Sequence, residues 1–194
     1  MDAEKQDWKK KALDFFKINF SKKNNLWRLL WFFVGCSICL IPSLACNLLI
    51  RNGSWFPSHI EYNPGIAFGN LENNPAAIYA IQSIICVIIA CLILFTNKWY
   101  YTILLSLAFC GGFFNIIDRA TQYLSPIPNT NWQPDYVLDY INTLWFFDTI
   151  SNVPDICILT GIIGFAVLYI TMLIIQLVKD KKQEDIKKTT ACPN

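Results

Sequence analysis

Four long apolar runs, none of which contains a charged residue, constrain this chain more than any other feature of its sequence. The runs are Leu29–Ile50, Ala76–Phe95, Trp99–Ile117 and Ile156–Val178. Each is close to the ~20 residues that an α-helix needs to cross the hydrocarbon core of a bilayer. Helices of water-soluble proteins rarely reach this length without a charge. The pattern therefore predicts an all-α membrane protein with four transmembrane helices.

The overall composition supports the same fold class. Of the 194 residues, 54% are hydrophobic and only 15% are charged, whereas about 25% of the residues in a typical soluble domain carry a charge. So few charged residues cannot cover the surface of an ordinary soluble or disordered chain. The formal net charge is only +2 and basic residues do not interleave with aromatic ones in a patch, so we expect no nucleic acid among the partners.

The basic residues predict how the chain is oriented in the membrane. Of the 16 Lys and Arg residues, eight precede the first apolar run, five follow the last one and three lie between them. Because basic segments remain on the cytoplasmic side, we expect both termini in the cytoplasm. The connections 51–75 and 118–155 then face outside, and the second of these contains five Asp residues against a single Arg.

This pattern divides the chain into three parts. Residues 27–178 form the predicted four-span domain, preceded by a basic tail at 1–26 and followed by another at 179–194. In the first tail Leu13, Phe16 and Phe20 share one helix face, which fits either an amphipathic helix lying in the plane of anionic membrane lipids or a solvated basic tail. The second tail has no apolar stripe, so we expect it to be loose.

The cysteines and the single histidine offer little chemistry. Most of the eight cysteines lie within the apolar runs, where a thiol behaves as a small hydrophobic group. A zinc site needs about four ligands and His59 is the only histidine, so we expect no metal and no cofactor. The segment 42–46 loosely resembles the lipobox of a lipoprotein precursor. Three further apolar runs follow it, so we predict a retained helix rather than a cleaved signal.

Polar side chains gather at the outer ends of the third and fourth runs and in the segment between them. They are Asn115, Asp118, Arg119, Asp139, Asn152 and Asp155. An ionisable side chain at the edge of the membrane is costly to bury, so each of these residues is a candidate for function. Their number on one side of the membrane favours a shared site.

Two interpretations of these residues remain open at this point. In the first, Asp155 only caps the start of its helix and Asp118 forms a structural ion pair with Arg119. In the second, two carboxylates lie together in a low-dielectric setting and share a proton. One of them can then act as a base on water while the other donates a proton to a carbonyl group. The second interpretation permits peptide hydrolysis without a metal.

Four short patterns, in order along the chain, carry a resemblance to a known family. They are Asn63–Gly69, Gly111–Arg119, Val137–Ile141 and Asn152–Asp155. Together they resemble the patterns of the lipoprotein signal peptidase family (signal peptidase II), which are intramembrane aspartyl proteases with four spans and both termini in the cytoplasm. The resemblance covers residues 27–178 and leaves out the two tails.

The resemblance implies a function and a set of site residues. Asp139 and Asp155 would be the catalytic pair. The residues that orient them or hold the substrate would be Asn63, Gly65, Asn115, Asp118, Arg119 and Asn152. The substrate would be a diacylglyceryl-modified prolipoprotein, cut just before its lipidated Cys in contact with membrane lipids. The outer loops would form a small β-like cradle and a lid at the extracytoplasmic face of a bacterial cell membrane.

The chain also departs from the family pattern. In the first span, relatives carry an acidic residue and a Lys where this chain has Pro42 and Cys46. The fourth pattern has Ser151 in place of Phe and Pro154 in place of Ala. These changes motivate an alternative, a catalytically silent paralogue that binds lipoproteins or signal helices without cleaving them. A small transporter is disfavoured, because no apolar run has a charge midway.

Overall fold

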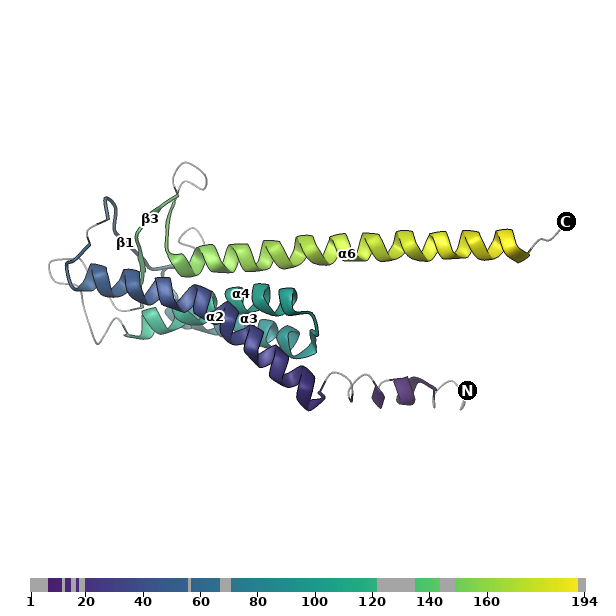
Figure 1. The fold of residues 1–194 in the computed structure, drawn as a ribbon. Coiled ribbons are helices and arrows are strands. Elements are labelled where there is room, and N and C mark those ends of the chain that lie inside the picture. The colour runs from purple at the N-terminus through teal and green to yellow at the C-terminus, as the bar shows by residue number, and fades with distance from the viewer. Residues whose placement is uncertain are drawn as a thin grey trace.

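The computed structural model describes residues 7–11, 13–14, 17, 20–55, 57–66, 71–121, 135–143 and 149–191. Its long helices are α2 (Lys22–Arg51), α3 (Pro75–Phe95), α4 (Trp99–Thr121) and α6 (Val153–Ala191). Figure 1 shows these helices running alongside one another. All four are long and apolar enough to cross a membrane, which confirms the prediction of a mostly helical protein with four helices that could span a membrane.

Local sequence signals mark where two of these helices begin. The Ser21 hydroxyl accepts a hydrogen bond from the Asn24 backbone N–H at 3.3 Å at the start of α2. Asn74 caps α3 in the same way, since its Oδ1 accepts from the Ala77 N–H at 3.1 Å. Such caps satisfy backbone donors that have no partner within the helix.

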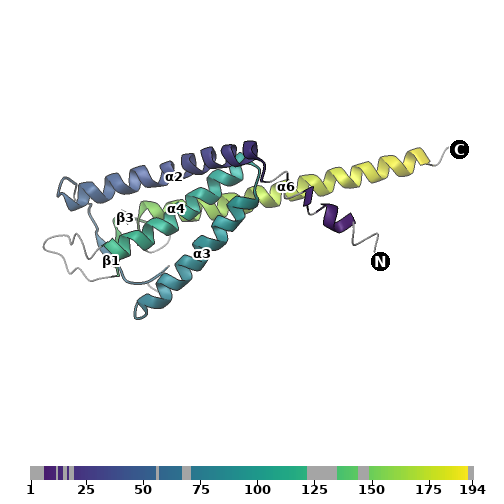
Figure 2. The same ribbon diagram turned by 90° about the horizontal axis from the view of Figure 1, so that it is seen from below.

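Helix α4 lies at the centre of the bundle and packs against α2, α3 and α6 (Figure 2). Half of its most apolar stretch is buried by protein, compared with 22% for α2 and α3 and 6% for α6. Helix α6 approaches α4 so closely that a Cβ atom on Gly161 would overlap the backbone of Leu104. Small residues allow such close packing between helices in lipid.

A group of cysteines forms much of the contact between three of the helices. Cys36 and Cys39 of α2, Cys110 of α4 and Cys157 of α6 are buried together with Leu107. All four thiols are free. They therefore fill the core as small apolar side chains, in the way that the sequence predicts.

Short strands lie at one end of the bundle. Strand β1 (Glu61–Asn63) pairs antiparallel with β2 (Val137–Asp139), with Glu61 opposite Asp139. Strand β3 (Ile141–Asn142) pairs antiparallel with β4 (Ile150–Ser151). Figure 1 shows the strands between the end of α2 and the start of α6. Parts of the predicted cradle and lid, at 67–70, 122–134 and 144–148, lie outside the described residues.

The structure bears differently on the predictions made for the two terminal tails. The prediction of a loose C-terminal tail is wrong, because α6 continues as a helix to Ala191. Residues 179–191 contain neither Gly nor Pro, so nothing in this segment stops a helix that has already formed. In the N-terminal tail, Leu13 and Phe20 are exposed and Phe16 lies outside the described residues.

Candidate active site

Asp139, the last residue of β2, is almost fully buried, with 2% of its surface exposed. Its Oδ1 accepts a hydrogen bond from Asn152 Nδ2 at 2.8 Å, and its Oδ2 accepts one from Asn63 Nδ2 at 3.1 Å. Strand β1 supplies Asn63 and pairs directly with β2. The small sheet therefore fixes both the position and the orientation of this carboxyl group.

Asp155 lies in the first turn of α6 and takes part in a reciprocal cap with Asn152. Asn152 Oδ1 accepts from the Asp155 N–H at 2.8 Å, and Asp155 Oδ2 accepts from the Asn152 N–H at 3.2 Å. This pairing is the capping-box arrangement of a helix N-terminus. The other oxygen, Oδ1, accepts from Asn115 Nδ2 of α4 at 2.8 Å. Asp155 therefore caps its helix and belongs to the polar cluster as well.

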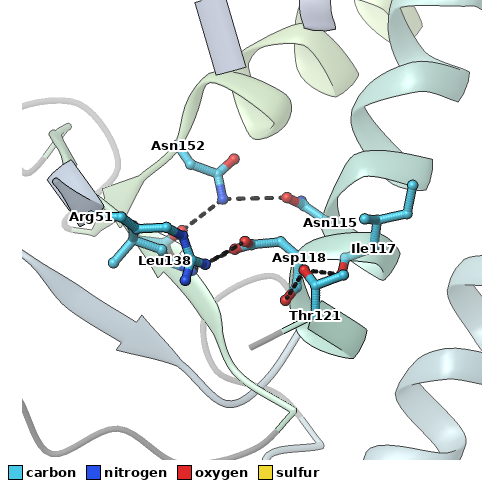
Figure 3. A network of polar contacts seen from close by, with 8 residues as sticks. Arg51, Asn115, Ile117, Asp118, Thr121, Leu138 and Asn152 are labelled. Atoms are coloured by element: carbon cyan, nitrogen blue, oxygen red, sulfur yellow. Dashed lines mark hydrogen bonds and ion pairs between the residues drawn. The ribbon is translucent and has the colours of Figure 1, made fainter. Parts of the chain in front are cut away.

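Two asparagines connect the two aspartates. Asn152 Nδ2, which donates to Asp139, also lies 3.3 Å from Asn115 Oδ1. Figure 3 shows the side chains of Asn152 and Asn115 pointing toward one another between the start of α6 and α4. The amides thus form a continuous path from Asp139 through Asn152 and Asn115 to Asp155.

Arg119, near the end of α4, holds the loop that follows β1. Its NH1 group donates to the backbone oxygens of Asn63 at 3.2 Å and Asp135 at 2.6 Å, and its NH2 group donates to the Gly65 oxygen. The Gly65 N–H in turn donates to Asn63 Oδ1 at 2.9 Å. The guanidinium group therefore orients Asn63, whose Nδ2 binds Asp139.

Asp118 holds β2 in place rather than pairing with its neighbour Arg119. Its Oδ2 accepts from the Leu138 N–H at 3.0 Å, and its Oδ1 lies 3.3 Å from the Arg51 NH2 group at the end of α2 (Figure 3). The structure thus shows an Asp118–Arg51 contact in place of the Asp118–Arg119 ion pair of the first interpretation. Asp118 ties α2 and α4 to the strand that ends in Asp139.

The electrostatic setting favours one proton on Asp139 at neutral pH. Burial raises the pKa of its carboxyl group to about 8, and the nearby charge of Asp155 contributes to the rise. The hydrogen bonds from Asn63 and Asn152 and the charge of Arg119 oppose this rise in the pKa. An isolated Asp has a pKa of about 4, so the protonated acid persists here over a much wider pH range.

These residues open onto one cleft of about 370 Å³. Asn63, Gly65, Asn115, Arg119, Asp139 and Asp155 all line it. Asn152 and Asp118 are buried behind this lining. One wall is apolar and comes from the α6 residues Ile156, Leu159 and Ile162. Within the described ranges, no group of three or more His, Cys, Asp or Glu side chains is arranged to hold a metal ion.

Sequence reasoning missed some residues of the cleft. Gln82 of α3 lines the cleft, as do Thr143 and Ser151 at the second small sheet. Gln82 is the only amide side chain in the run Ala76–Phe95. That isolated polar group within a predicted span was the signal that could have identified it.

Comparisons with known proteins identify the family of this chain. A family model described as signal peptidase (SPase) II matches residues 40–174. A lipoprotein signal peptidase of Malacoplasma penetrans is 29% identical over 93% of this chain and 80% of its own length. One of Mycoplasmoides gallisepticum is 33% identical over 68% of this chain and 41% of its own length.

Two further similarities are weaker. A lipoprotein signal peptidase of Bifidobacterium adolescentis is 28% identical over 79% of this chain and 72% of its own length. A solved structure described as a bacterial membrane enzyme covers 84% of this chain, with 17% identity and a TM-score of 0.48. The family match spans well over half of the sequence. The chain therefore belongs to the signal peptidase II family of membrane proteases that process lipoproteins.

Proposed function

We propose that this protein is an active aspartyl endopeptidase that removes signal peptides from diacylglyceryl-modified prolipoproteins, cutting just before the lipidated Cys. One observation carries the proposal: Asp139 and Asp155 line the same cleft and are connected through Asn152 and Asn115. Two carboxyl groups that share a setting of low dielectric and differ in protonation can supply the acid and the base for hydrolysis.

The positions of the two aspartates suggest a role for each. Asp139 holds the proton, since burial raises its pKa to about 8. We assign the single proton of the coupled pair to Asp139 and the negative charge to Asp155, where the helix dipole at the N-terminus of α6 and the hydrogen bond from Asn115 favour the carboxylate. Asp155 accepts a proton from the attacking water while Asp139 donates its proton to the carbonyl oxygen of the scissile peptide.

The reaction then completes without any other group. Water adds to the carbonyl carbon and forms a tetrahedral diol. Asp155, now protonated, gives its proton to the departing nitrogen as the C–N bond breaks, and Asp139 takes a proton back from the diol. The products are the free carboxyl terminus of the signal peptide and the free amino group of the lipidated Cys. Both aspartates return to their starting states.

The apolar wall of the cleft suits a signal helix that enters from the lipid. Ile156, Leu159 and Ile162 follow one another along one face of α6, and each exposes more than 40% of its surface. Gln82 faces the same cleft from α3. Both α3 and α6 pack on α4, so a substrate helix can lie between them. The end of the substrate helix, which carries the scissile peptide, would then lie beside Asp139 and Asp155.

We place this site at the extracytoplasmic face of the cell membrane, with both termini in the cytoplasm. The distribution of basic residues supports this orientation, because thirteen of them flank the four spans at the chain ends. Figure 1 shows the start of α2 and the end of α6 on the side away from the strands. The outer loops, which include β1 to β4, would act as the cradle and lid.

A cleavage assay with purified protein tests the proposal. Wild-type protein in detergent should release the signal peptide from a synthetic diacylglyceryl precursor. Asp139→Asn and Asp155→Asn should each lower the rate by about 10²–10⁴-fold, the usual contribution of a general acid or base. Asp180→Asn is the control, since Asp180 is an exposed residue of α6 far along the helix from Asp155. Binding without cleavage by the wild type would establish the silent paralogue instead.

A further inference from the structure

A second cavity lies at the other end of the bundle from the cleft. It has a volume of about 270 Å³ and is bounded by the start of α2, the α3–α4 connection and the first turn of α4. Figure 2 shows the start of α2 beside this connection. The cleft, in contrast, is lined by Asn115 and Arg119 near the last turn of α4. The cavity is therefore separate from the proposed active site.

Arg28 is the central polar residue of this cavity, and only 7% of its surface is exposed. Its Nε donates to the Thr96 backbone oxygen at 3.0 Å, and its NH1 and NH2 groups donate to the side-chain oxygens of Asn25 at 2.9 Å and Asn97 at 3.0 Å. These contacts hold the guanidinium plane, and its positive charge, in a fixed position beside the cavity.

The surroundings of Arg28 make the cavity attractive to an anion. Among the described residues that line it, none is acidic, and Asn24 and Asn97 add amide donors. Lys23 and Lys98 are adjacent to these two asparagines in the sequence. Helices α2 and α4 both begin at this end, and helix N-termini carry a partial positive charge. A phosphate group matches this arrangement, because arginine and amide donors bind its oxygens well.

The remaining lining is aromatic. Trp31 lies between Trp27 and Trp99, with ring centroids 6.4 Å and 5.3 Å away. Trp27 and Trp99 each expose about half of their surface, 52% and 55%. Indole rings prefer the boundary between hydrocarbon and headgroups in a membrane. A free phosphate ion would make no use of them, whereas the glycerol and upper acyl chain of a phospholipid would cover them.

We propose that this cavity binds the headgroup of an anionic phospholipid. The phosphate lies against Arg28, Asn24 and Asn97, and the glycerol and acyl carbons lie against the three tryptophans. The lipid would join α2 to the α3–α4 connection and so stabilise this end of the bundle. Neither the two aspartates nor the proposed cleavage reaction takes part in this interaction.

The test measures the melting temperature of the full-length protein in a non-ionic detergent. Three additions are compared: phosphatidylglycerol, phosphatidylcholine and inorganic phosphate at the same phosphate concentration. A ligand that binds only the folded state raises the melting temperature in a saturable way. We expect this rise with phosphatidylglycerol and a much smaller one with each of the other two.

A charge variant locates the effect. Asn24→Asp places a carboxylate beside the cavity, and the first turn of α2 tolerates it because the helix dipole favours a negative charge there. It should raise the phosphatidylglycerol concentration needed for half of the effect by about tenfold, a change that corresponds to about 1.4 kcal/mol. Asn74→Asp is the matched control, because it makes the same change at the N-cap of α3 at the other end.

An aromatic variant tests the lipid part of the ligand. Trp99→Leu should weaken the response to phosphatidylglycerol, whereas Trp8→Leu, at an exposed residue outside the cavity, should leave it unchanged. The proposal is overturned if Asn24→Asp responds like the wild type, or if phosphatidylcholine acts as strongly as phosphatidylglycerol. An equal effect of inorganic phosphate would show a site for soluble anions and would equally rule out the lipid.

Discussion

Each end of the helical bundle contains a buried arginine, and the two are held in similar ways. Arg119 exposes 2% of its surface and Arg28 exposes 7%. Both donate to backbone oxygens of a neighbouring connection: Arg119 to those of Asn63, Gly65 and Asp135, and Arg28 to that of Thr96. In both places a planar group with several donors fastens a helix to a loop.

The difference lies in what surrounds the two guanidinium groups. Arg119 shares its cleft with Asp139 and Asp155, and its charge opposes the rise in the pKa of Asp139. The cavity of Arg28 has no acidic residue in the described part of its lining. The same side chain therefore orients internal carboxyl groups at one end and offers its charge to an external anion at the other. The residues around each arginine, rather than the extent of its burial, therefore determine its role.

The largest difference between the two arginines is expected in the activity of their lysine variants. Arg119→Lys keeps the charge but loses the planar fork of donors that holds Asn63 and Gly65. We expect kcat/KM for prolipoprotein cleavage to fall by about 10²-fold, since misplaced supporting groups have effects of that order. Arg28→Lys should change kcat/KM by less than about threefold, because Arg28 lies at the opposite end of the bundle from the two aspartates.

Circular dichroism melting of both variants provides the control for folding. Equal losses of kcat/KM in Arg119→Lys and Arg28→Lys, with both variants folded, would contradict the separate roles assigned to the two ends.

The second prediction concerns the pH dependence of activity. The proposed mechanism needs a proton on Asp139, whose pKa is raised to about 8. The value of kcat/KM should therefore fall as the pH rises above about 8. A pH–rate profile tests this prediction. The precursor used for it should have no group that titrates in this range. A rate that stays level to pH 10 would exclude Asp139 as the acid.

The same pKa has a consequence for stability. Asp139 keeps its proton in the folded state up to a pH of about 8, whereas an unfolded Asp loses it at about 4. The folded state binds more protons between these values, so the free energy of unfolding decreases as the pH rises through this window. Asp139→Asn should remove this decrease. Its melting temperature should exceed that of the wild type at pH 8 and match it near pH 4.

A smaller effect is expected from Asp118→Asn. The amide oxygen can still accept from the Leu138 N–H, but the charged contact with Arg51 is lost. Because the Asp118 side chain is buried and that of Arg51 is only partly exposed, we expect a loss of about 2 kcal/mol in the free energy of unfolding. Chemical denaturation of the wild type and the variant measures this difference. A loss as large as that of a fully buried ion pair would contradict the geometry.

The smallest expected effect is a change in KM that distinguishes the buried amide side chains of Gln82 and Asn47. Among the described residues, Gln82 Oε1 and Asn47 Oδ1 are both buried without a hydrogen-bond partner, yet only Gln82 lines the cleft. Gln82→Leu should raise KM by about fivefold, the value of one hydrogen bond to a substrate. Asn47→Leu should leave KM unchanged. Steady-state kinetics of the two variants measures this difference. Equal KM values in both variants would show that Gln82 makes no hydrogen bond to the substrate.

The four spans could be predicted from the sequence, because long uncharged runs have few alternatives to a transmembrane helix. The reciprocal cap of Asn152 and Asp155 was also accessible, since it depends on residues three positions apart. The contact of Asp118 with Arg51 joins residues 67 positions apart, and no local pattern indicates it. Sequence order favoured the neighbour Arg119 instead.

The small strands and the cavities were harder to foresee. Strands of two or three residues are too short for a periodic pattern. The position of Asn63 next to Asp139 follows from the pairing of β1 with β2, which brings together segments separated by two spans. The cavity around Arg28 likewise depends on how α2 packs beside the α3–α4 connection. Its three tryptophans lie at or near the ends of two apolar runs, and no local pattern connects them.

Mass spectrometry of the cleavage products tests the central claim most directly. Purified wild-type protein is incubated with one diacylglyceryl prolipoprotein, alongside Asp139→Asn and Asp155→Asn. We predict that the wild type yields a lipidated Cys with a free amino group and an intact signal peptide, and that neither variant yields these products at a comparable rate. Wild-type levels of the same products from either variant would contradict catalysis by this pair of aspartates.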